Sequence, residues 1–355
     1  MIKVFIIDDS ALIRALLTEI LGKADDIEVV GTAPDPLIAR EKIKRIIPDV
    51  LTLDIEMPHM DGISFLKNLM RLRPMPVVMI STLTEKGAPA TLEALELGAV
   101  DFVGKPKTDM ANGMHDFSAE IIEKVRAASK ANVRALENRP AATEVAPTQK
   151  PPLDINKRLY VKPGQLVAIG ASTGGTEAIK TVLIDMPENS PPIVLAQHIP
   201  ANFSKSYAQR LDDNSAMNVY EAEHQQPILS GCAYLAPGDF HLRIAKHKDG
   251  YICMLDQKEK ECRHRPSVDA MFNSIAKLRV KNALGILLTG MGSDGALGLL
   301  AMKQAGCMTM VQDEASSVVW GMPGSAVKLG AEQEIVSLHK VASKIISNSM
   351  FAKKN

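Results

Sequence analysis

Short apolar runs alternate with stretches of helical periodicity along the first third of the chain, and this alternation predicts a parallel-sheet α/β domain. Strands are expected at Val4 to Ile7, Glu28 to Val30, Val50 to Leu53, Val77 to Ile80 and Asp101 to Val103. Helices are expected between and after them, at residues 11–21, 36–47, 63–72, 88–97 and 117–125. Five strands and five helices therefore make up a predicted domain over residues 1–125.

The second half repeats the pattern over residues 156–350 and predicts a doubly wound, mainly parallel α/β domain. Strands are expected at Leu166 to Ile169, Ile193 to Ala196, Leu284 to Leu288 and Met308 to Val311, with helices at 177–184, 204–211 and 295–304. Two further apolar runs, at 241–244 and 251–254, are joined through Lys248-Asp249-Gly250, which predicts an antiparallel hairpin.

Between the halves, residues 126–155 have no usable periodicity and contain four prolines. A segment of this composition, without aromatic residues, buries too little apolar surface to offset chain entropy. It is expected to be a Pro-rich linker. The length of 355 residues allows two or three domains of ~150 residues, and this pattern favours two domains and a tether.

Composition excludes several classes of function. The 41 Lys and Arg residues balance the 41 Asp and Glu residues, so no overall field attracts nucleic acid or an anionic membrane. The four cysteines include no Cys-x-x-Cys pair that would indicate structural zinc or a dithiol centre. The apolar run near the N-terminus is too short for a signal peptide, and no stretch approaches the ~20 apolar residues that span a bilayer. A cytoplasmic protein without membrane insertion is expected.

Polar side chains follow the predicted strands of the first half, where ligands bind in an open parallel sheet. These residues are Asp8 and Asp9, Asp54, Ser81 and Thr82, and Lys105. Three carboxylates at one sheet edge repel one another unless a divalent cation lies among them, which favours Mg²⁺. A lysine and a hydroxyl nearby suit a phosphoryl group. The alternative is that these residues cap helices, as Asp9-Ser10 could do.

The joint pattern is more specific than any one residue. The Asp8-Asp9 pair, D-x-x-M-P-x-x-D-G over Asp54 to Gly62, and Lys105-Pro106 resemble the flavodoxin-like receiver domain of two-component response regulators. The resemblance implies that Asp54 accepts a phosphoryl group from a histidine kinase. It also implies that Asp8, Asp9, Asp54 and the backbone carbonyl of Glu56 hold Mg²⁺, that Lys105 contacts the phosphoryl group, and that Ser81 moves toward it with Phe102 as aromatic partner. Whether Ser81 or Thr82 supplies the switch hydroxyl stays open.

A second set of polar residues follows strands of the second half. Gly170-Ala171-Ser172-Thr173-Gly174 has the G-x-S-x-G pattern of a serine exposed at a tight strand-to-helix turn. By itself this turn equally suits a phosphate or dinucleotide cradle. His198 and Asp294 are expected at the same sheet edge, and Ser, His and Asp together are the set needed to activate a hydroxyl. The chain order differs from the Ser, Asp, His order of α/β-hydrolases, and each residue could instead cap a helix or lie in a turn.

The motifs ASTGG, QHIP, LAPGDFHL, RPSVD and TGMGSDG occur in this order after the receiver and the linker. The whole chain therefore resembles the chemotaxis response-regulator protein-glutamate methylesterases, the CheB family. This resemblance implies Ser172 as nucleophile, His198 as general base and acid, and Asp294 as its orienting acid. The backbone N–H of Met291 would help bind the oxyanion, and Thr173 would lie beside the nucleophile.

The resemblance also implies the substrate and the regulation. The expected substrates are γ-glutamyl methyl esters on the cytoplasmic helices of chemoreceptors, with deamidation of receptor glutamines as a second activity. No cofactor is expected at the hydrolase site. The expected phosphodonor is a chemotaxis histidine kinase, and phosphorylation of Asp54 would relieve masking of the catalytic sheet by the receiver. The main alternative is a non-enzymatic, phosphorylation-dependent adaptor. Receptor preference, dominant phosphodonor, packing between the domains and oligomeric state are left open.

Overall fold

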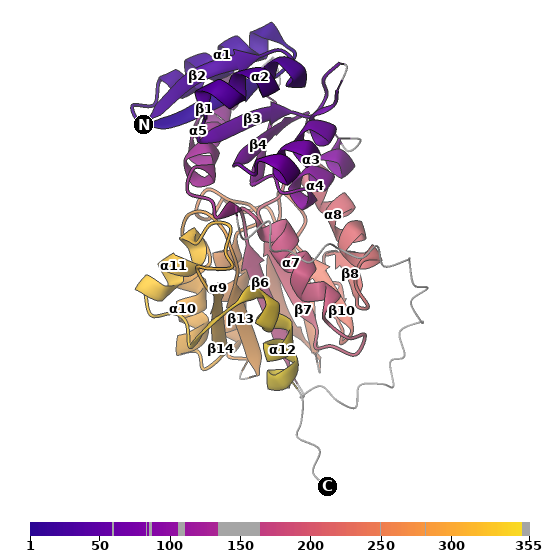
Figure 1. Ribbon diagram of the computed structural model, residues 1–355. Helices are drawn as coiled ribbons and strands as arrows, with labels where there is room; N and C mark the ends of the chain where they lie inside the picture. The colour runs from indigo at the N-terminus through magenta and orange to yellow at the C-terminus, as the bar shows by residue number, and fades with distance from the viewer. Residues whose placement is uncertain are drawn as a thin grey trace. The chain divides into compact units, whose positions relative to one another are not determined.

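The structure is a computed structural model that describes residues 1–58, 60–82, 84, 87–105, 111–133, 164–248, 250–280 and 282–349. The chain divides into two compact units, Met1–Asn138 and Arg139–Asn355, which Figure 1 colours from indigo to magenta and from pink to yellow. Helix α5 (Ala111–Ala128) runs three residues past its predicted end at 125 and so takes up the first residues assigned to the linker. The rest of the predicted linker, from residue 134, lies outside the described residues.

The first unit contains one five-stranded parallel sheet in the order β2-β1-β3-β4-β5. This is the flavodoxin-like strand order. The strands are β1 (Ile2–Ile7), β2 (Ile27–Ala33), β3 (Val50–Asp54), β4 (Val77–Ser81) and β5 (Asp101–Gly104). The helices besides α5 are α1 (Ala11–Gly22), α2 (Pro36–Ile46), α3 (Gly62–Leu72) and α4 (Ala88–Glu96). All five predicted strands and helices are present.

The inner strands of this sheet are buried on both faces because helices cover both. Val4 to Ile7 in β1 and Val77 to Ile80 in β4 are fully buried, which explains their unbroken apolar runs. Ser10 caps α1 by accepting a hydrogen bond from the Ile13 N–H at 3.4 Å. The capping role suggested for Asp9-Ser10 thus falls to Ser10, and neither Asp8 nor Asp54 caps a helix.

The second unit contains a seven-stranded parallel sheet in the order β15-β14-β13-β6-β7-β10-β8. Its strands are β6 (Leu166–Ala171), β7 (Ile193–Gln197), β8 (Asn218–Glu221), β10 (Cys232–Leu235), β13 (Ala283–Leu287), β14 (Met308–Gln312) and β15 (Glu334–Val336). The helices are α7 (Gly175–Ile184), α8 (Ala201–Asp213), α9 (Val268–Leu278), α10 (Ala296–Gln304), α11 (Gly321–Lys328) and α12 (Leu338–Ser349). In Figure 1, α7 and α12 lie in front of the sheet, and α9, α10 and α11 lie on its other side.

The predicted hairpin is present but belongs to a separate sheet. β11 (His241–His247) and β12 (Gly250–Asp256) pair antiparallel, and β9 (Pro227–Ile228) adds a third strand to them. β8, β10 and β15 have four residues or fewer, too short for a readable pattern, and were not anticipated. Helices α9, α11 and α12 were not anticipated either.

Strand β6 lies at the point where the strand order reverses. From β6 the chain builds outward through β7 toward β8, and it later returns through β13 to build the opposite side of the sheet. Ligands in such sheets bind in the crevice outside the carboxyl ends of the strands at this switch point. The turns after β13, β6 and β7 meet there.

Candidate functional site

The carboxyl edge of the first sheet brings Asp8, Asp54 and Lys105 together. Both aspartates are buried, Asp8 just after β1 and Asp54 as the last residue of β3. Lys105 follows β5, and its Nζ lies 2.8 Å from Asp54 Oδ2 and 3.2 Å from Asp8 Oδ2. Asp9 is exposed beside them. The edge therefore presents a buried carboxylate with an ammonium group at hydrogen-bonding distance.

Burial governs the electrostatics of this cluster. Loss of solvation raises the pKa of Asp54 to about 6; the Lys105 hydrogen bond opposes the shift, and the neighbouring charge of Asp8 adds to it. Burial also raises the pKa of Asp8. The carboxylates of Asp8, Asp9 and Asp54 offer oxygens within 4.8 Å of one another, and Lys105 Nζ, at 3.2 Å, is a cationic partner of the buried Asp8 Oδ2. This oxygen donor set fits a divalent cation such as Mg²⁺.

The two candidate switch hydroxyls differ in burial. Ser81 is buried at the end of β4, and its Oγ lies 2.8 Å from Thr91 Oγ1 on α4. Thr82 is half-buried. Phe102 is buried in β5, and Lys124 Nζ lies 5.1 Å from its ring centroid. The roles of Ser81 and Phe102 in a phosphoryl switch stay predictions.

At the switch point of the second sheet, Ser172, His198 and Asp294 form a continuous hydrogen-bonded chain. His198 Nδ1 lies 3.1 Å from Ser172 Oγ, and its Nε2 lies 2.8 Å from Asp294 Oδ2. In chymotrypsin the two ring nitrogens have the opposite assignments. The sequence analysis predicted that the three residues lie at one edge of the sheet, and in the structure they lie within hydrogen-bonding distance of one another through His198.

Glycines, and not these side chains, cap the neighbouring helices. Gly174, with φ of +75°, is the N-cap of α7, and Gly295 is the N-cap of α10. Helix α10 therefore begins at Ala296 and not at Gly295 as expected. The capping alternatives for Ser172 and Asp294 do not apply to α7 and α10, so both side chains can face His198.

Backbone hydrogen bonds fix the serine turn against the neighbouring strands. The Ser172 N–H donates to Thr289 O at 3.0 Å, and Gln197 Nε2 donates to Ser172 O at 2.9 Å. Gly290 approaches so closely that an added Cβ would lie 2.9 Å from Ser172 Cβ and 2.2 Å from Met322 Sδ. Only glycine fits at this position, and it brings the next turn beside the serine.

Asp294 lies at the N-terminus of α9, a contact that sequence reasoning missed. Its oxygens accept hydrogen bonds from Ser267 Oγ at 2.8 Å and from the N–H groups of Val268 at 2.7 Å and Asp269 at 3.0 Å. Burial opposes ionisation, but the hydrogen bonds and charge of His198, together with the two N–H donors, hold the pKa of Asp294 below its usual value. The signal for α9 was present: Ser267 precedes apolar residues at 268, 271, 272 and 275, which is helical spacing.

Met291 and Thr173 flank the serine turn. Met291 is half-buried, and its N–H donates no hydrogen bond to a described residue. Thr173 is buried, and its carbonyl oxygen accepts a hydrogen bond from Thr289 Oγ1 at 3.0 Å. Their predicted roles, oxyanion binding for Met291 and contact with the triad for Thr173, stay predictions.

Comparison with known proteins assigns a known domain family to each half of the chain. Residues 4–112 match the response regulator receiver domain and residues 167–345 match CheB methylesterase. A protein-glutamate methylesterase/protein-glutamine glutaminase of Saccharophagus degradans is 57% identical over 350 residues, which are 98% of this chain and 99% of the relative. The chain belongs to the CheB methylesterase family.

Other CheB-family relatives give the same picture. A Xanthomonas campestris protein with the same enzyme name is 55% identical over 353 residues, 99% of this chain and 98% of its own. The crystal structure of the Thermotoga maritima CheB methylesterase catalytic domain matches with a TM-score of 0.51 and 36% identity, over 52% of this chain and 98% of that one. The two relatives carry enzyme names, so the comparisons give no support to a non-enzymatic adaptor. Among the described residues, no helix is long and apolar enough to cross a membrane.

The buried acid Asp269, whose N–H donates to Asp294, gives a prediction about stability and pH. Asp269 is 5% exposed; burial raises its pKa to about 6, the Gly298 N–H opposes the shift, and the charge of Asp294 adds to it. Because the folded pKa exceeds the usual 3.8, the folded state binds the proton more tightly, and stability falls as pH rises from about 4 to about 6. The proton on Asp269 therefore contributes about 3 kcal/mol to the free energy of unfolding at low pH, and this contribution is lost near neutral pH.

An Asp269→Asn protein should lose this pH-dependent contribution to the free energy of unfolding, because asparagine does not titrate. Its side-chain oxygen can still accept the Gly298 hydrogen bond. Relative to the unmodified protein, its free energy of unfolding should rise by up to about 3 kcal/mol between pH 4 and pH 7. Urea unfolding at several pH values measures this difference. A difference that does not change with pH would show that Asp269 has an ordinary pKa.

Proposed function

We propose that this CheB-family protein is a phosphorylation-activated serine hydrolase of the cytoplasm that removes methyl groups from γ-glutamyl methyl esters on chemoreceptor helices. The observation that carries the proposal is the hydrogen-bonded chain from Ser172 through His198 to Asp294. A serine hydroxyl, an imidazole and a buried carboxylate in this order make the constellation that activates serine for acyl transfer.

In the proposed reaction, His198 Nδ1 takes the proton of Ser172 Oγ as this oxygen attacks the ester carbonyl. Asp294 stabilises the imidazolium ion through Nε2, and the Met291 N–H binds the oxyanion that develops. His198 then returns the proton to the departing methoxy group, and methanol leaves. Water, deprotonated by His198, cleaves the acyl-enzyme and restores Ser172 with release of the glutamate carboxylate.

The same residues would carry out glutamine deamidation. The side-chain amide and the ester reach the same kind of tetrahedral intermediate, and His198 would protonate the –NH2 group of this intermediate as the C–N bond breaks, so that ammonia leaves instead of methanol. This second activity rests on the names of the relatives from S. degradans and X. campestris.

The first unit would receive the regulatory signal from a chemotaxis histidine kinase. Asp54 would attack the phosphoryl group, and Lys105 would bind its oxygens. Asp8, Asp9, Asp54 and the Glu56 carbonyl would hold Mg²⁺, which would neutralise charge at this edge when bound. Phosphorylation would raise hydrolase activity by shifting the population toward an active state.

A serine-directed fluorophosphonate tests the nucleophile. The reagent is expected to label the full chain at Ser172, because only an activated serine reacts quickly. Peptide mapping by mass spectrometry locates the label, and Ser172→Ala should remove it. Ser343, an exposed serine on α12, provides the matched control Ser343→Ala, which should label normally. Rapid labelling of Ser172→Ala would refute the assignment.

A further inference from the structure

The ring of His264 lies flat against the ring of His198. The two ring centroids are 3.7 Å apart and the planes are 13° from parallel. We propose that His264 is a positioning residue: its ring covers one face of the His198 ring and keeps His198 in the orientation that contacts both Ser172 Oγ and Asp294 Oδ2. This inference rests on the proposed function, because it assigns His198 as the proton carrier.

The stack supplies a restraint that the hydrogen bonds of His198 lack. Its two nitrogens contact Ser172 Oγ and Asp294 Oδ2, and the N–H bond and the lone pair through which an imidazole makes such contacts lie in the plane of the ring. Hydrogen bonds at the two edges still permit the ring to tilt about the line between them. A second ring packed against the face blocks this tilt, and the His198 side chain is only 10% exposed.

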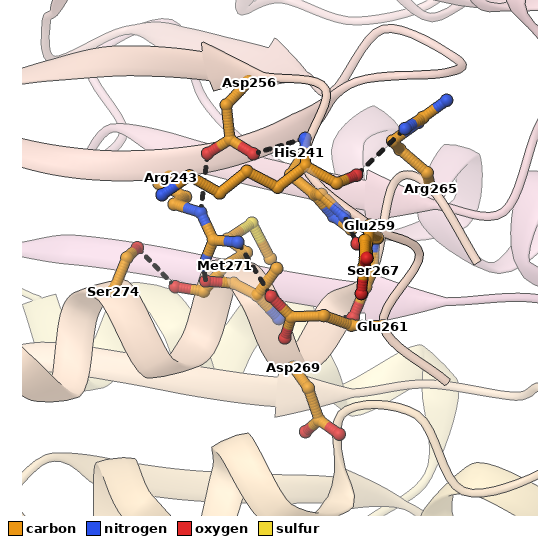
Figure 2. Close-up of polar contacts among 12 residues, drawn as sticks. His241, Arg243, Asp256, Glu259, Glu261, Arg265, Ser267, Asp269, Met271 and Ser274 are labelled. Carbon is orange, nitrogen blue, oxygen red and sulfur yellow. Dashed lines mark hydrogen bonds and ion pairs between the residues drawn. The ribbon is translucent and has the colours of Figure 1, made fainter. Parts of the chain in front are cut away.

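The segment that carries His264 is fixed from both sides. Upstream, the His264 N–H donates to Glu261 O at 2.9 Å, and the Glu261 carboxylate pairs with Arg243 Nη2 at 2.7 Å. Arg243 lies on β11 and also pairs with Asp256 at the end of β12, at 2.8 Å. Figure 2 shows Arg243 between these two carboxylates. The upstream end of the segment is therefore tied to the hairpin.

Downstream, Arg265 forms a second anchor. Its guanidinium contacts Asp239 Oδ1 at 2.6 Å and donates to the carbonyl oxygens of Gln257 and Lys258 at 2.8 and 2.9 Å. Two residues on, Ser267 Oγ donates to Asp294 Oδ1. In Figure 2, Arg265 and Ser267 lie on the right of the network, and Ser274 lies on its left. His264 thus lies between two residues with fixed contacts, Glu261 and Arg265. The chain after Arg265 leads to Ser267, which contacts the carboxylate that is hydrogen-bonded to His198.

Backbone conformation agrees with a segment that is held in place. Cys262 and Arg263, directly before His264, have φ values of +50° and +68°. Residues other than glycine rarely adopt this left-handed region and do so where surrounding contacts enforce it. The ion pairs of Arg243 and Arg265 provide such contacts. The stacked ring is therefore preset before a substrate binds.

Positioning through the stack predicts a specific kinetic change. His264→Ala removes the covering ring and leaves both hydrogen bonds of His198, so the reactive geometry is populated less often. With methylated receptor as substrate and the full chain as enzyme, kcat should fall by about 10- to 100-fold while KM stays within about twofold. His264→Phe keeps a flat ring without a titratable nitrogen and should restore most of kcat.

The controls separate this inference from the proposed function. The unmodified chain reports the function: if it releases no methanol, the proposed function fails. The rate of fluorophosphonate labelling at Ser172 then still tests the stack, and His264→Ala should slow it while His264→Phe does not. Thermal unfolding of both variants should match the unmodified chain. An unchanged kcat in His264→Ala would overturn the proposal, and so would a His264→Phe protein as slow as His264→Ala.

Discussion

A Ser172→Ala protein is expected to release methanol from methylated receptor about 10³- to 10⁶-fold more slowly than the unmodified chain. The alanine removes the atom that forms the acyl-enzyme, and His198 then has no hydroxyl to deprotonate. Transition-state binding by the remaining groups, such as the Met291 N–H, would leave a small residual rate above that of uncatalysed hydrolysis. The initial rate of methanol release at saturating receptor measures the loss.

The loss should come from chemistry and not from misfolding. Ser172 lies in a turn whose fixed contacts are made by backbone atoms: its N–H donates to Thr289 O and its carbonyl oxygen accepts from Gln197. Alanine preserves both hydrogen bonds. Thermal unfolding should therefore be unchanged, and Ser343→Ala should keep full activity. A Ser172→Ala protein with more than a tenth of the normal rate would exclude serine nucleophilic catalysis.

An Asp54→Asn protein is expected to lose phosphoryl transfer entirely. The amide that replaces the carboxylate cannot act as the nucleophile, although it has nearly the same volume and can still approach Lys105. Intact-protein mass after incubation with acetyl phosphate and Mg²⁺ measures the incorporated phosphoryl group. Asp25→Asn, which changes an exposed aspartate of the same unit, is the matched control and should be phosphorylated normally.

The same substitution should separate basal from stimulated hydrolysis. Without phosphodonor, Asp54→Asn and the unmodified chain should release methanol at similar rates, because the hydrolase residues lie in the other unit. With acetyl phosphate, only the unmodified chain should speed up, by the 5- to 150-fold (about 1–3 kcal/mol) typical of coupling between sites. A stimulated Asp54→Asn protein would show that Asp54 is not the regulatory acceptor.

Strand ends were the most predictable part of both sites. Asp8 and Lys105 follow β1 and β5 of one sheet, and Asp54 ends β3 of the same sheet; Ser172, His198 and Asp294 follow the three adjacent strands β6, β7 and β13 of the other. In parallel sheets all strands end at the same edge, so polar residues directly after buried strands converge whatever the intervening sequence. The local sequence pattern was therefore sufficient to predict that these residues lie close together.

Contacts between distant segments were not predictable in this way. The Asp294 carboxylate accepts hydrogen bonds from residues 267–269 at the start of α9. No pattern in either segment of the sequence indicates that the two segments are in contact. His264 lies in a loop without periodicity, so its place over His198 depends on the anchors at Arg243 and Arg265. The choice of Nδ1 for the serine follows from three-dimensional placement, which the identities of the residues do not reveal.

Release of methanol from methylated receptor, followed for the unmodified chain, Ser172→Ala and Asp54→Asn with and without acetyl phosphate, tests the central claim most directly. The account predicts release by the unmodified chain that rises with acetyl phosphate, an unstimulated basal rate for Asp54→Asn, and almost no release by Ser172→Ala under either condition. Release by Ser172→Ala at the rate of the unmodified chain would contradict it.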